Sequence, residues 1–425
     1  MKKTFGSLFM GDRVIWFIFF LLCAVSLVEV FSAVSTLSYK SGNFWAPIGQ
    51  HATYLGVGAV VCWAIHRIEC RWFRALPVLL YGASILMLFY TTVFGAVVND
   101  ASRWMSFFGL FQFQPSEIAK CAVVMVTAML LSSLQTEDGA DKRAMKYILW
   151  AAVPICVLIF MENLSTAAIL FTVVFLMMYV GRVPLVQLGK LLGVIILTGA
   201  IVGSIVYGVA KSDTDHKLGE LPLVGKVFHR AETWIGRFEA KAGDEDADPL
   251  KYDIENKAQV AHANIAIANS NIVGRAPGNS VERDFLSQAF SDFIFAIIIE
   301  ETGVEGAFFV LSLYIFLLFR VGQLASRCER TFAPFLAMGL ALLLVTQAMV
   351  NMAVAVGLMP VTGQPLPLIS RGGTSTIINC FYIGMILSVS RYARQSSHPE
   401  HTSFDAPLRG VKHEEVKSAT VPAEN

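Results

Sequence analysis

Long apolar runs separated by short polar connections dominate the pattern of this chain. Each run is close to the length of about 20 residues that a helix needs to cross a bilayer. Two runs, 146–161 and 164–181, are short and separated only by Glu162 and Asn163, so a single broken hairpin also fits them. The pattern predicts an all-α integral membrane protein with about ten transmembrane helices, at 13–36, 48–66, 75–98, 116–133, 146–161, 164–181, 184–209, 292–319, 332–356 and 373–390.

The connection 210–291 is much longer than the others, and we expect it to be partly helical. Apolar residues recur at helical spacing within 226–238, which predicts an amphipathic helix at the membrane surface. The stretch AQVAHANIAIANSNIVG, from Ala258, predicts a second helix. The polar segment after Arg394 lacks periodicity and is expected to be disordered. The chain is therefore interpreted as one membrane domain, 1–395, that includes the loop 210–291, followed by a cytoplasmic tail, 396–425.

Lys and Arg are unevenly divided between alternate connections. One set, which includes 67–74, 142–146, 320–330 and 391–394, is rich in them, and the other set is poor. Because basic residues are retained on the cytoplasmic side, both termini are predicted to be cytoplasmic and the loop 210–291 to lie outside.

Composition supports a membrane protein and excludes several other classes. Hydrophobic residues make up 55% of the 425 residues and charged residues only 15%, which is unlike a soluble domain. The formal net charge of +1 gives no sign of nucleic-acid binding. The seven cysteines form no C-x-x-C pair, so neither a zinc site nor a redox motif is indicated.

Carboxylates in the predicted eighth span are the first candidate for chemistry, because ionised acids are costly inside a membrane. Asp292 begins this span, and Ser291 before it is placed to cap the helix. Asp292 is either a helix-start carboxylate favoured by the macrodipole or a functional group. On a straight helix Glu300 would lie roughly 12 Å deeper and Glu301 nearly opposite to Asp292, so at least one of the two is expected to be paired within the bundle.

Two further polar segments lie on the same predicted outer side. In ASRWMSFFGLFQFQPSEIAK, which contains Arg103, the side chains of Glu117 and Lys120 are three residues apart on one helix face. The partner of Lys120 is either Glu117 or an acid across the bundle, Asp292 or Glu300. In MPVTGQPLPLISRGGTSTI, which contains Ser370 and Arg371, prolines and glycines predict an irregular backbone that membrane depth tolerates only inside protein or around a water-filled cavity.

These segments resemble the SEDS family of bacterial cell-wall synthesis, which includes FtsW, RodA and SpoVE. FQFQPSEIAK, GNS…SDFIFAIIIEETG and MPVTGQPLPLISRGGTS are similar to three family motifs in the family's order, and the resemblance covers nearly the whole chain. APGNS with SDFIFA is more like the cell-division branch, FtsW, than the elongation branch, RodA. The chain departs from the family pattern at Asn163, at Ser287 and at Arg371, where the family usually has an acid, a proline and an aromatic residue.

The resemblance implies a glycosyltransferase that polymerises lipid II into glycan strands at the outer face of the bacterial cytoplasmic membrane, at the division septum. Asp292 corresponds to the family's essential aspartate and would act as the base that takes the acceptor proton, or as a ligand of Mg²⁺ or Mn²⁺; the sequence is compatible with either role. The implied partners are lipid II, undecaprenyl pyrophosphate, a class B penicillin-binding protein and other division proteins. Expected substrate-binding residues are Lys120, Glu117, Arg103, Glu300, Arg371 and Ser370. An elongation-type polymerase like RodA, a lipid flippase or transporter, and a non-catalytic scaffold stay open as alternative functions.

Overall fold

A helix lies at each of the ten positions where the apolar pattern predicts one. The computed structural model describes residues 9–33, 45–94, 96–98, 101–107, 111–212, 258–286, 289–328 and 332–396. Seven helices in these ranges are long and apolar enough to cross a membrane, and α6, α9 and α10 carry shorter apolar stretches. The long helices are α2 (Arg13–Ala33), α4 (Ala46–Ile65), α6 (Pro77–Phe94), α7 (Pro115–Ser133), α8 (Ala144–Glu162), α9 (Leu164–Val180), α10 (Leu185–Ser212), α13 (Ile294–Ala325), α14 (Phe332–Ala355) and α15 (Thr374–Ser396).

Short elements connect these helices, and one group of them was not predicted. Helix α12 (Ala258–Asn269) lies in the long loop as expected, followed by a 3-10 turn, η3 (Glu282–Asp284), while α5 (Cys70–Phe73) joins α4 to α6. The strands β1 (Ala96–Val98), β2 (Ala101–Phe107) and β3 (Phe111–Phe113) form an antiparallel sheet in the order β1-β2-β3. The third span therefore ends at Phe94 instead of 98. The expected helix at 226–238 and the tail 397–425 lie outside the described residues.

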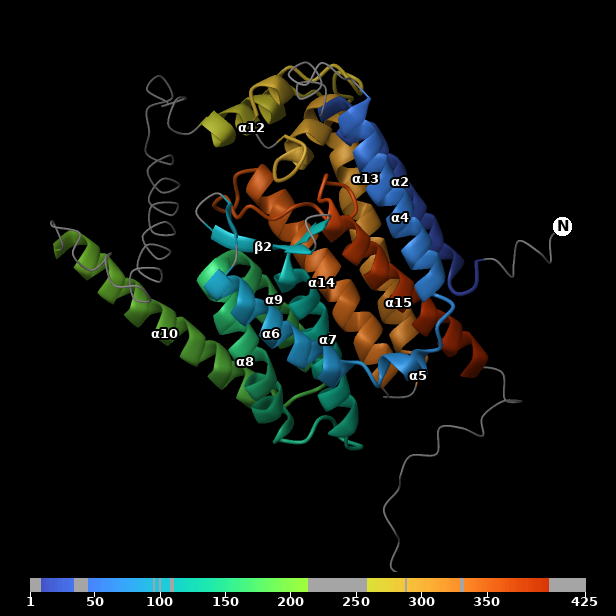
Figure 1. Ribbon diagram of the computed structural model, residues 1–425, viewed down its shortest axis with the longest axis vertical. Helices are drawn as coiled ribbons and strands as arrows, with labels where there is room; N and C mark the ends of the chain where they lie inside the picture. Colours follow the sequence, from blue (N-terminus) through green and yellow to red (C-terminus); the bar gives the residue numbers. More distant parts are fainter. Residues whose placement is uncertain are drawn as a thin grey trace, which may run out of the picture.

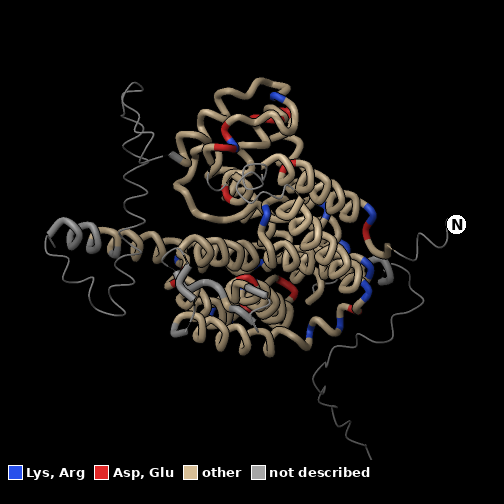
Figure 2. Tube along the Cα trace, turned by 45° about the horizontal axis from the view of Figure 1, so that its top comes forward, with Lys and Arg blue, Asp and Glu red and all other residues tan. Residues whose placement is uncertain are grey.

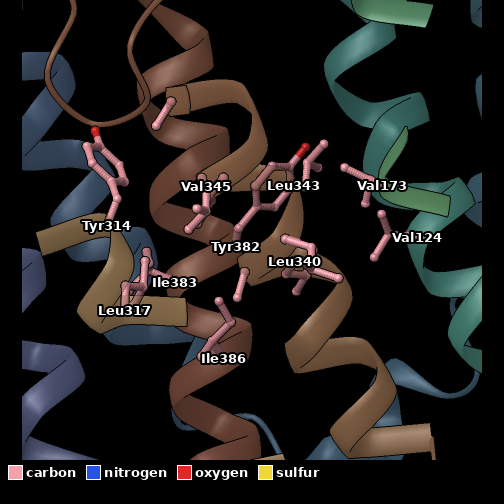
Figure 3. Packing of buried hydrophobic residues seen from close by; sticks show 14 of the residues in the cluster. Val124, Val173, Tyr314, Leu317, Leu340, Leu343, Val345, Tyr382, Ile383 and Ile386 are labelled. Atoms are coloured by element: carbon pink, nitrogen blue, oxygen red, sulfur yellow. The ribbon is translucent and has the colours of Figure 1, made fainter. Parts of the chain in front are cut away.

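The core of the bundle is formed by α7, α14 and α15. Helix α14 packs against α7, α9, α13 and α15, and Figure 1 shows it in the middle of the bundle, whereas α10 packs against α9 and projects outward. Figure 3 shows the ring of Tyr382 lying among aliphatic side chains of α14, including Leu340, Leu343 and Val345. The hydroxyl of Tyr382 donates to the carbonyl of Glu117 over 2.7 Å. This bond fixes the first turn of α7, which carries Glu117, against α15.

Helix α13 is interrupted at Gly303, which has a non-helical backbone (φ 72°, ψ −171°). A Cβ atom there would lie only 2.1 Å from the carbonyl oxygen of Ile272, so the loop packs against the break as closely as glycine permits. The amides of Arg275 and Ala276 donate to the carbonyls of Glu300 and Glu301, the two residues that end the first half of α13. The straight helix assumed for the eighth span is therefore wrong.

The two ends of the bundle differ in charge. Asp12 binds Arg320 over 2.7 Å, its amide donates to Ser390, and Arg391 donates to the carbonyl of Arg67. The basic connections therefore meet at one end, and Figure 2 shows Lys and Arg concentrated along the side where the chain begins. Figure 1 shows α5 at this end and α12 at the other.

Candidate active site

A cavity of about 580 Å³ lies at the α12 end of the bundle, among the connections that contain few Lys and Arg residues. Its walls come from the starts of α4, α7, α9 and α15, from the turn before α13, and from the segment between α14 and α15. Most of the lining residues are polar, although the helices that carry them are apolar. They are Gln50, Tyr54, Gln114, Glu117, Asn163, Thr166, Phe290, Ser291, Asp292, Gly363, Gln364, Pro365, Arg371, Gly372, Gly373, Thr374 and Ser375.

Asp292 lines this cavity from a turn and not from a helix end. Helix α13 begins two residues later, at Ile294, and Phe293 is its N-cap without a side-chain capping bond. The expected capping by Ser291 is therefore wrong, and its hydroxyl instead donates to Oδ1 of Asp292 over 2.8 Å. The carbonyl of Asp292 accepts a 2.8 Å hydrogen bond from Nδ2 of Asn351 on α14. The first bond orients the carboxylate, which is partly exposed in the cavity, and the second holds the backbone of the turn.

The segment 358–373, between α14 and α15, forms a second wall and has the irregular backbone that its composition predicts. Side chains of surrounding helices hold its carbonyls: Asn351 donates to Gln364 over 2.7 Å, and Gln347 donates to Pro365 over 3.1 Å. Tyr314 donates to the carbonyl of Pro367. These bonds replace the helical hydrogen bonds that this segment lacks inside a largely apolar bundle.

Glu117 and Lys120 form the local ion pair that their spacing favours, with Nζ 2.8 Å from Oε1. Pro115 occupies the first turn of α7, as proline prefers. Lys120 is fully buried, and its ammonium also donates to Oε1 of Gln347 over 3.0 Å. Its partner is therefore neither Asp292 nor Glu300. Lys120 lies behind Glu117 instead of lining the cavity, and Gln347 connects it to the segment 358–373.

Ser370 and Arg371 lie at the end of that segment, beside the turn that carries Asp292. The Ser370 hydroxyl donates to the carbonyl of Ser291 over 2.6 Å, and the Arg371 amide donates to the carbonyl of Phe290 over 2.9 Å. Ser370 is buried and does not line the cavity, so it holds the turn in place. The Arg371 side chain does line the cavity.

Glu300 and Glu301 lie outside the cavity, and both bind the loop before α13. Glu300 accepts bonds from the hydroxyl of Ser280 over 2.5 Å and from the amide of Val281 over 3.1 Å. Glu301 accepts bonds from the amide of Ser280 in this loop over 3.3 Å and from the hydroxyl of Ser32 on α2. Both acids are fully buried. The sequence analysis expected at least one of them to have a partner within the bundle, and the loop provides hydrogen-bond partners for both. The prediction that Glu300 contacts substrate finds no support in this arrangement.

The structure describes the side chain of Asn163 but not that of Arg103, the two other residues singled out by the sequence analysis. Arg103 belongs to β2, but its side chain lies outside what the structure describes. Asn163, which stands where the family usually has an acid, lines the cavity and caps α9 by accepting bonds from the amides of Ser165 and Thr166 over 3.0 and 3.3 Å. An asparagine therefore serves as a helix cap at this position.

A carboxylate of the cavity could take part in holding a divalent cation together with substrate. No group of three or more His, Cys, Asp or Glu side chains suited to a metal occurs among the described residues. Mg²⁺ is nevertheless commonly held by one or two carboxylates plus substrate phosphates, and Asp292 offers such a carboxylate to the cavity.

The sequence analysis missed the two buried amides of α14, Gln347 and Asn351. They are 3% and 1% exposed, lie four residues apart and therefore share one face of the helix. Two amides at this spacing in an otherwise apolar span were the available signal, since buried polar groups need partners. Gln50, Tyr54, Gln114 and Thr166 gave no signal, because only folding brings them to one cavity.

The fold and the site define a multi-pass membrane protein with a polar cavity built around one aspartate at one end of a helical bundle. The family model described as the cell cycle protein family FtsW/RodA/SpoVE matches residues 12–395, and the chain belongs to this family. The resemblance inferred from the three motifs is confirmed.

Curated relatives are similar over nearly their whole length. The chain is 29% identical over 396 residues to a probable peptidoglycan glycosyltransferase FtsW of Halomonas elongata, with 92% of each chain covered. It is 28% identical over 401 residues to the peptidoglycan glycosyltransferase MrdB of Escherichia coli, covering 93% of this chain and 98% of the relative. These names bear out the expectation of an enzyme.

Solved structures share the fold. One, titled as the structural coordination of polymerization and crosslinking by a peptidoglycan synthase complex, contains a chain 26% identical to this one with a TM-score of 0.68, covering 91% of this chain and 99% of that one. The crystal structure of the rod shape determining protein RodA of Thermus thermophilus matches with a TM-score of 0.59 at 25% identity, covering 90% and 97%. The all-α membrane fold is thereby confirmed.

Proposed function

We propose that this protein is a peptidoglycan glycosyltransferase that polymerises lipid II into glycan strands, with the cavity around Asp292 as its active site. The observation that carries the proposal is an oriented carboxylate in a polar cavity of a membrane bundle. The names of the relatives in Halomonas elongata and Escherichia coli support the reaction.

In the proposed reaction an acceptor hydroxyl attacks the anomeric carbon of the growing or incoming sugar. Asp292 takes the proton of that hydroxyl, which is the role of a general base. The bond from Ser291 orients the carboxylate, and the bond from Asn351 holds the backbone of its turn, before substrate arrives. A Mg²⁺ or Mn²⁺ ion, when bound, would be held by Asp292 and pyrophosphate oxygens and would offset negative charge on the leaving group.

We place the cavity on the outer face of the cytoplasmic membrane and both termini in the cytoplasm. The support is the gathering of basic connections at the opposite end of the bundle. The APGNS and SDFIFA motifs favour a role at the division septum over a role in elongation. A class B penicillin-binding protein is the proposed partner, because a similar chain was solved within a peptidoglycan synthase complex.

The test is polymerisation of labelled lipid II by the purified protein, compared with its Asp292→Asn and Asp292→Ala variants. Loss of the base should reduce the rate at least about 100-fold, in the range usual for general base catalysis. Asp284→Asn, which changes an exposed carboxylate of η3, serves as the control and should keep the wild-type rate.

Polymerisation by Asp292→Ala at a rate near wild type would overturn the assignment of the base. A wild-type protein that moves lipid II across vesicles without forming glycan would instead support a flippase, and one that does neither but still binds the transpeptidase would support a scaffold.

A further inference from the structure

Arg371 brings a positive charge to the cavity on the wall formed by the segment 358–373. Its guanidinium donates to Oε1 of Gln50 on α4 over 2.8 Å and lies 5.6 Å from the centre of the Phe290 ring. Its amide is bonded to the carbonyl of Phe290, two residues before Asp292. The guanidinium is therefore held from two sides, close to the turn that carries the proposed base.

This cation differs from the others at the same end of the bundle. Lys120 is paired with Glu117 at 2.8 Å, and Arg275 lies 3.6 Å from Glu300. Arg283 lies 3.9 Å from a carboxylate oxygen of Glu301. Within the described ranges Arg371 forms no ion pair with an acid, since its side-chain partners are an amide oxygen and an aromatic ring. Its positive charge is therefore available to an anion that enters the cavity.

Because Arg371 is half-buried, its interaction with such an anion is stronger than it would be in open water. Burial lowers the pKa of Arg371 below its ordinary value, and the nearby Tyr54 partly offsets this effect. A guanidinium that has lost part of its hydration gains more from a charge-assisted hydrogen bond than one in open water.

The start of α15 lies beside Arg371 in the wall of the cavity. Gly372, Gly373, Thr374 and Ser375 all line the cavity, and α15 begins at Thr374. Gly373 has a left-handed backbone (φ 54°), and a Cβ atom on it would meet no atom within 4 Å. The amides of Ser375 and Thr376 donate to the carbonyls of Gly372 and Gly373 over 3.1 and 3.2 Å, so the helix start acts through its dipole, which favours negative charge. Guanidinium and helix start therefore border the same part of the cavity.

We propose that Arg371 and the first turn of α15 form the subsite for the pyrophosphate of the lipid-linked sugar substrate. The inference rests on the proposed function and assigns the leaving-group end of its cavity. In the reaction, the acceptor oxygen forms a bond to the anomeric carbon and the bond from that carbon to the pyrophosphate oxygen breaks. The electron pair leaves with the pyrophosphate, next to Arg371, and the acceptor proton goes to Asp292.

The experiment measures binding separately from turnover, so that the subsite and the proposed function can fail independently. Undecaprenyl pyrophosphate, and inorganic pyrophosphate as a lipid-free probe, are titrated against the purified full-length protein by calorimetry. The variants are Arg371→Gln, which removes the positive charge, and Arg371→Lys, which keeps the charge but lacks the planar guanidinium with its paired N–H donors. Arg275→Gln is the matched control, because Arg275 lies at the same end of the bundle and outside the cavity lining.

Arg371→Gln is expected to weaken binding of both probes at least about tenfold, which corresponds to ~1.4 kcal/mol. Arg371→Lys should lie between Arg371→Gln and wild type, and Arg275→Gln should bind like wild type. In lipid II polymerisation Arg371→Gln should raise KM and weaken inhibition by undecaprenyl pyrophosphate by a similar factor. Loss of binding of the lipid-linked probe alone, with inorganic pyrophosphate unaffected, would overturn the subsite and indicate recognition of the lipid.

Equal binding of both probes by Arg371→Gln and wild type, or no binding by wild type, would also overturn the subsite. Gel filtration and thermal unfolding show whether each variant is folded. If Arg371→Gln does not fold, binding by Arg371→Lys is compared with binding by wild type instead. A protein that binds pyrophosphate through Arg371 but forms no glycan would contradict the proposed function and leave the anion subsite intact.

Discussion

At the scale of single residues, the polar side chains around Asp292 form a continuous set of hydrogen bonds. Asn351 binds the carbonyls of Asp292 and Gln364, while Gln347 binds Lys120 and the carbonyl of Pro365. Each buried amide therefore connects a functional segment to α14, and its removal would leave buried carbonyls without donors at a cost of about 1–3 kcal/mol each.

Replacing Asn351 with Leu should lower the kcat of glycan synthesis by about tenfold or more, while the KM for lipid II changes little. The substitution keeps the branched shape of the side chain but removes both bonds that position the Asp292 turn and its neighbouring wall, and a small displacement of a base is costly. Steady-state kinetics with labelled lipid II measure the two constants. Asn279→Ala, at an exposed loop amide, is the control; equal kinetics for Asn351→Leu and wild type would contradict a positioning role.

Variants of Lys120 test whether this residue does more than neutralise the charge of Glu117. If Lys120 served only to balance Glu117, removing both partners would be nearly neutral, and Lys120→Met with Glu117→Gln would restore the activity lost in Lys120→Met. We expect the double variant to stay as inactive as Lys120→Met, because Gln347 then loses the donor at its Oε1 and holds the segment 358–373 less firmly. The lipid II assay, normalised to protein amount, decides this, and rescue by the double variant would refute the expectation.

At the scale of elements, the break in α13 and the loop before it act as one unit. Gly274 and Gly303 both have a left-handed backbone, and a Cβ on Gly274 would lie 2.4 Å from the amide nitrogen of Gly303. Glu300 and Glu301 bind the same loop through their side chains. The conspicuous acids of the eighth span therefore stabilise the loop near the cavity, and they are not part of the cavity itself.

Gly303→Ala should destabilise the protein markedly, because alanine is strained at φ 72° and its Cβ would lie 2.1 Å from the Ile272 carbonyl oxygen. The expected result is a lower Tm in detergent and faster proteolysis of the loop before α13. Gly189→Ala on α10, where a Cβ meets no atom within 4 Å, is the matched control and should unfold like wild type. A Gly303→Ala protein with unchanged Tm and proteolysis would show that the loop tolerates displacement.

At the scale of the whole molecule, Asp12 joins three helices at the end opposite the cavity. It precedes α2, binds Arg320 of α13 over 2.7 Å and donates its amide to Ser390 of α15. Burial by itself would raise the pKa of Asp12. Hydrogen bonds from Arg320 and from the amides of Val14 and Ile15 outweigh burial and hold the pKa below its usual value.

Stability should consequently depend on Asp12 in acid. Because its folded-state pKa is depressed, its contribution is fully present above the pKa of the unfolded state and is lost as pH falls through the folded-state pKa. Asp12→Asn should lower Tm at neutral pH, since breaking a buried pair costs on the order of 3 kcal/mol. The difference in Tm between wild type and variant should shrink as the pH falls below 4, as seen in thermal scans from neutral to acid pH. A constant difference would exclude the ionised carboxylate as its source.

The sequence by itself determined the helices and the class of protein, and it singled out Asp292, which lines the cavity. Apolar runs near bilayer length leave helix as the favoured structure, because a backbone in lipid must satisfy its own hydrogen bonds. Pro115, the spacing of Glu117 and Lys120, and the glycines and prolines of 359–373 also act locally, and their predicted structures were confirmed.

Only the tertiary structure decided what the polar residues contact. A straight helix placed Glu300 below Asp292, whereas Asp292 lies in a turn before α13 and the preceding loop binds both glutamates outside the cavity. Sequence order gave no reason to connect Lys120 to Gln347, or Arg371 to Gln50, since these pairs are 227 and 321 residues apart. Helical periodicity fixes which face a residue occupies, but the partner on that face depends on how distant helices pack, which is decided by the whole bundle.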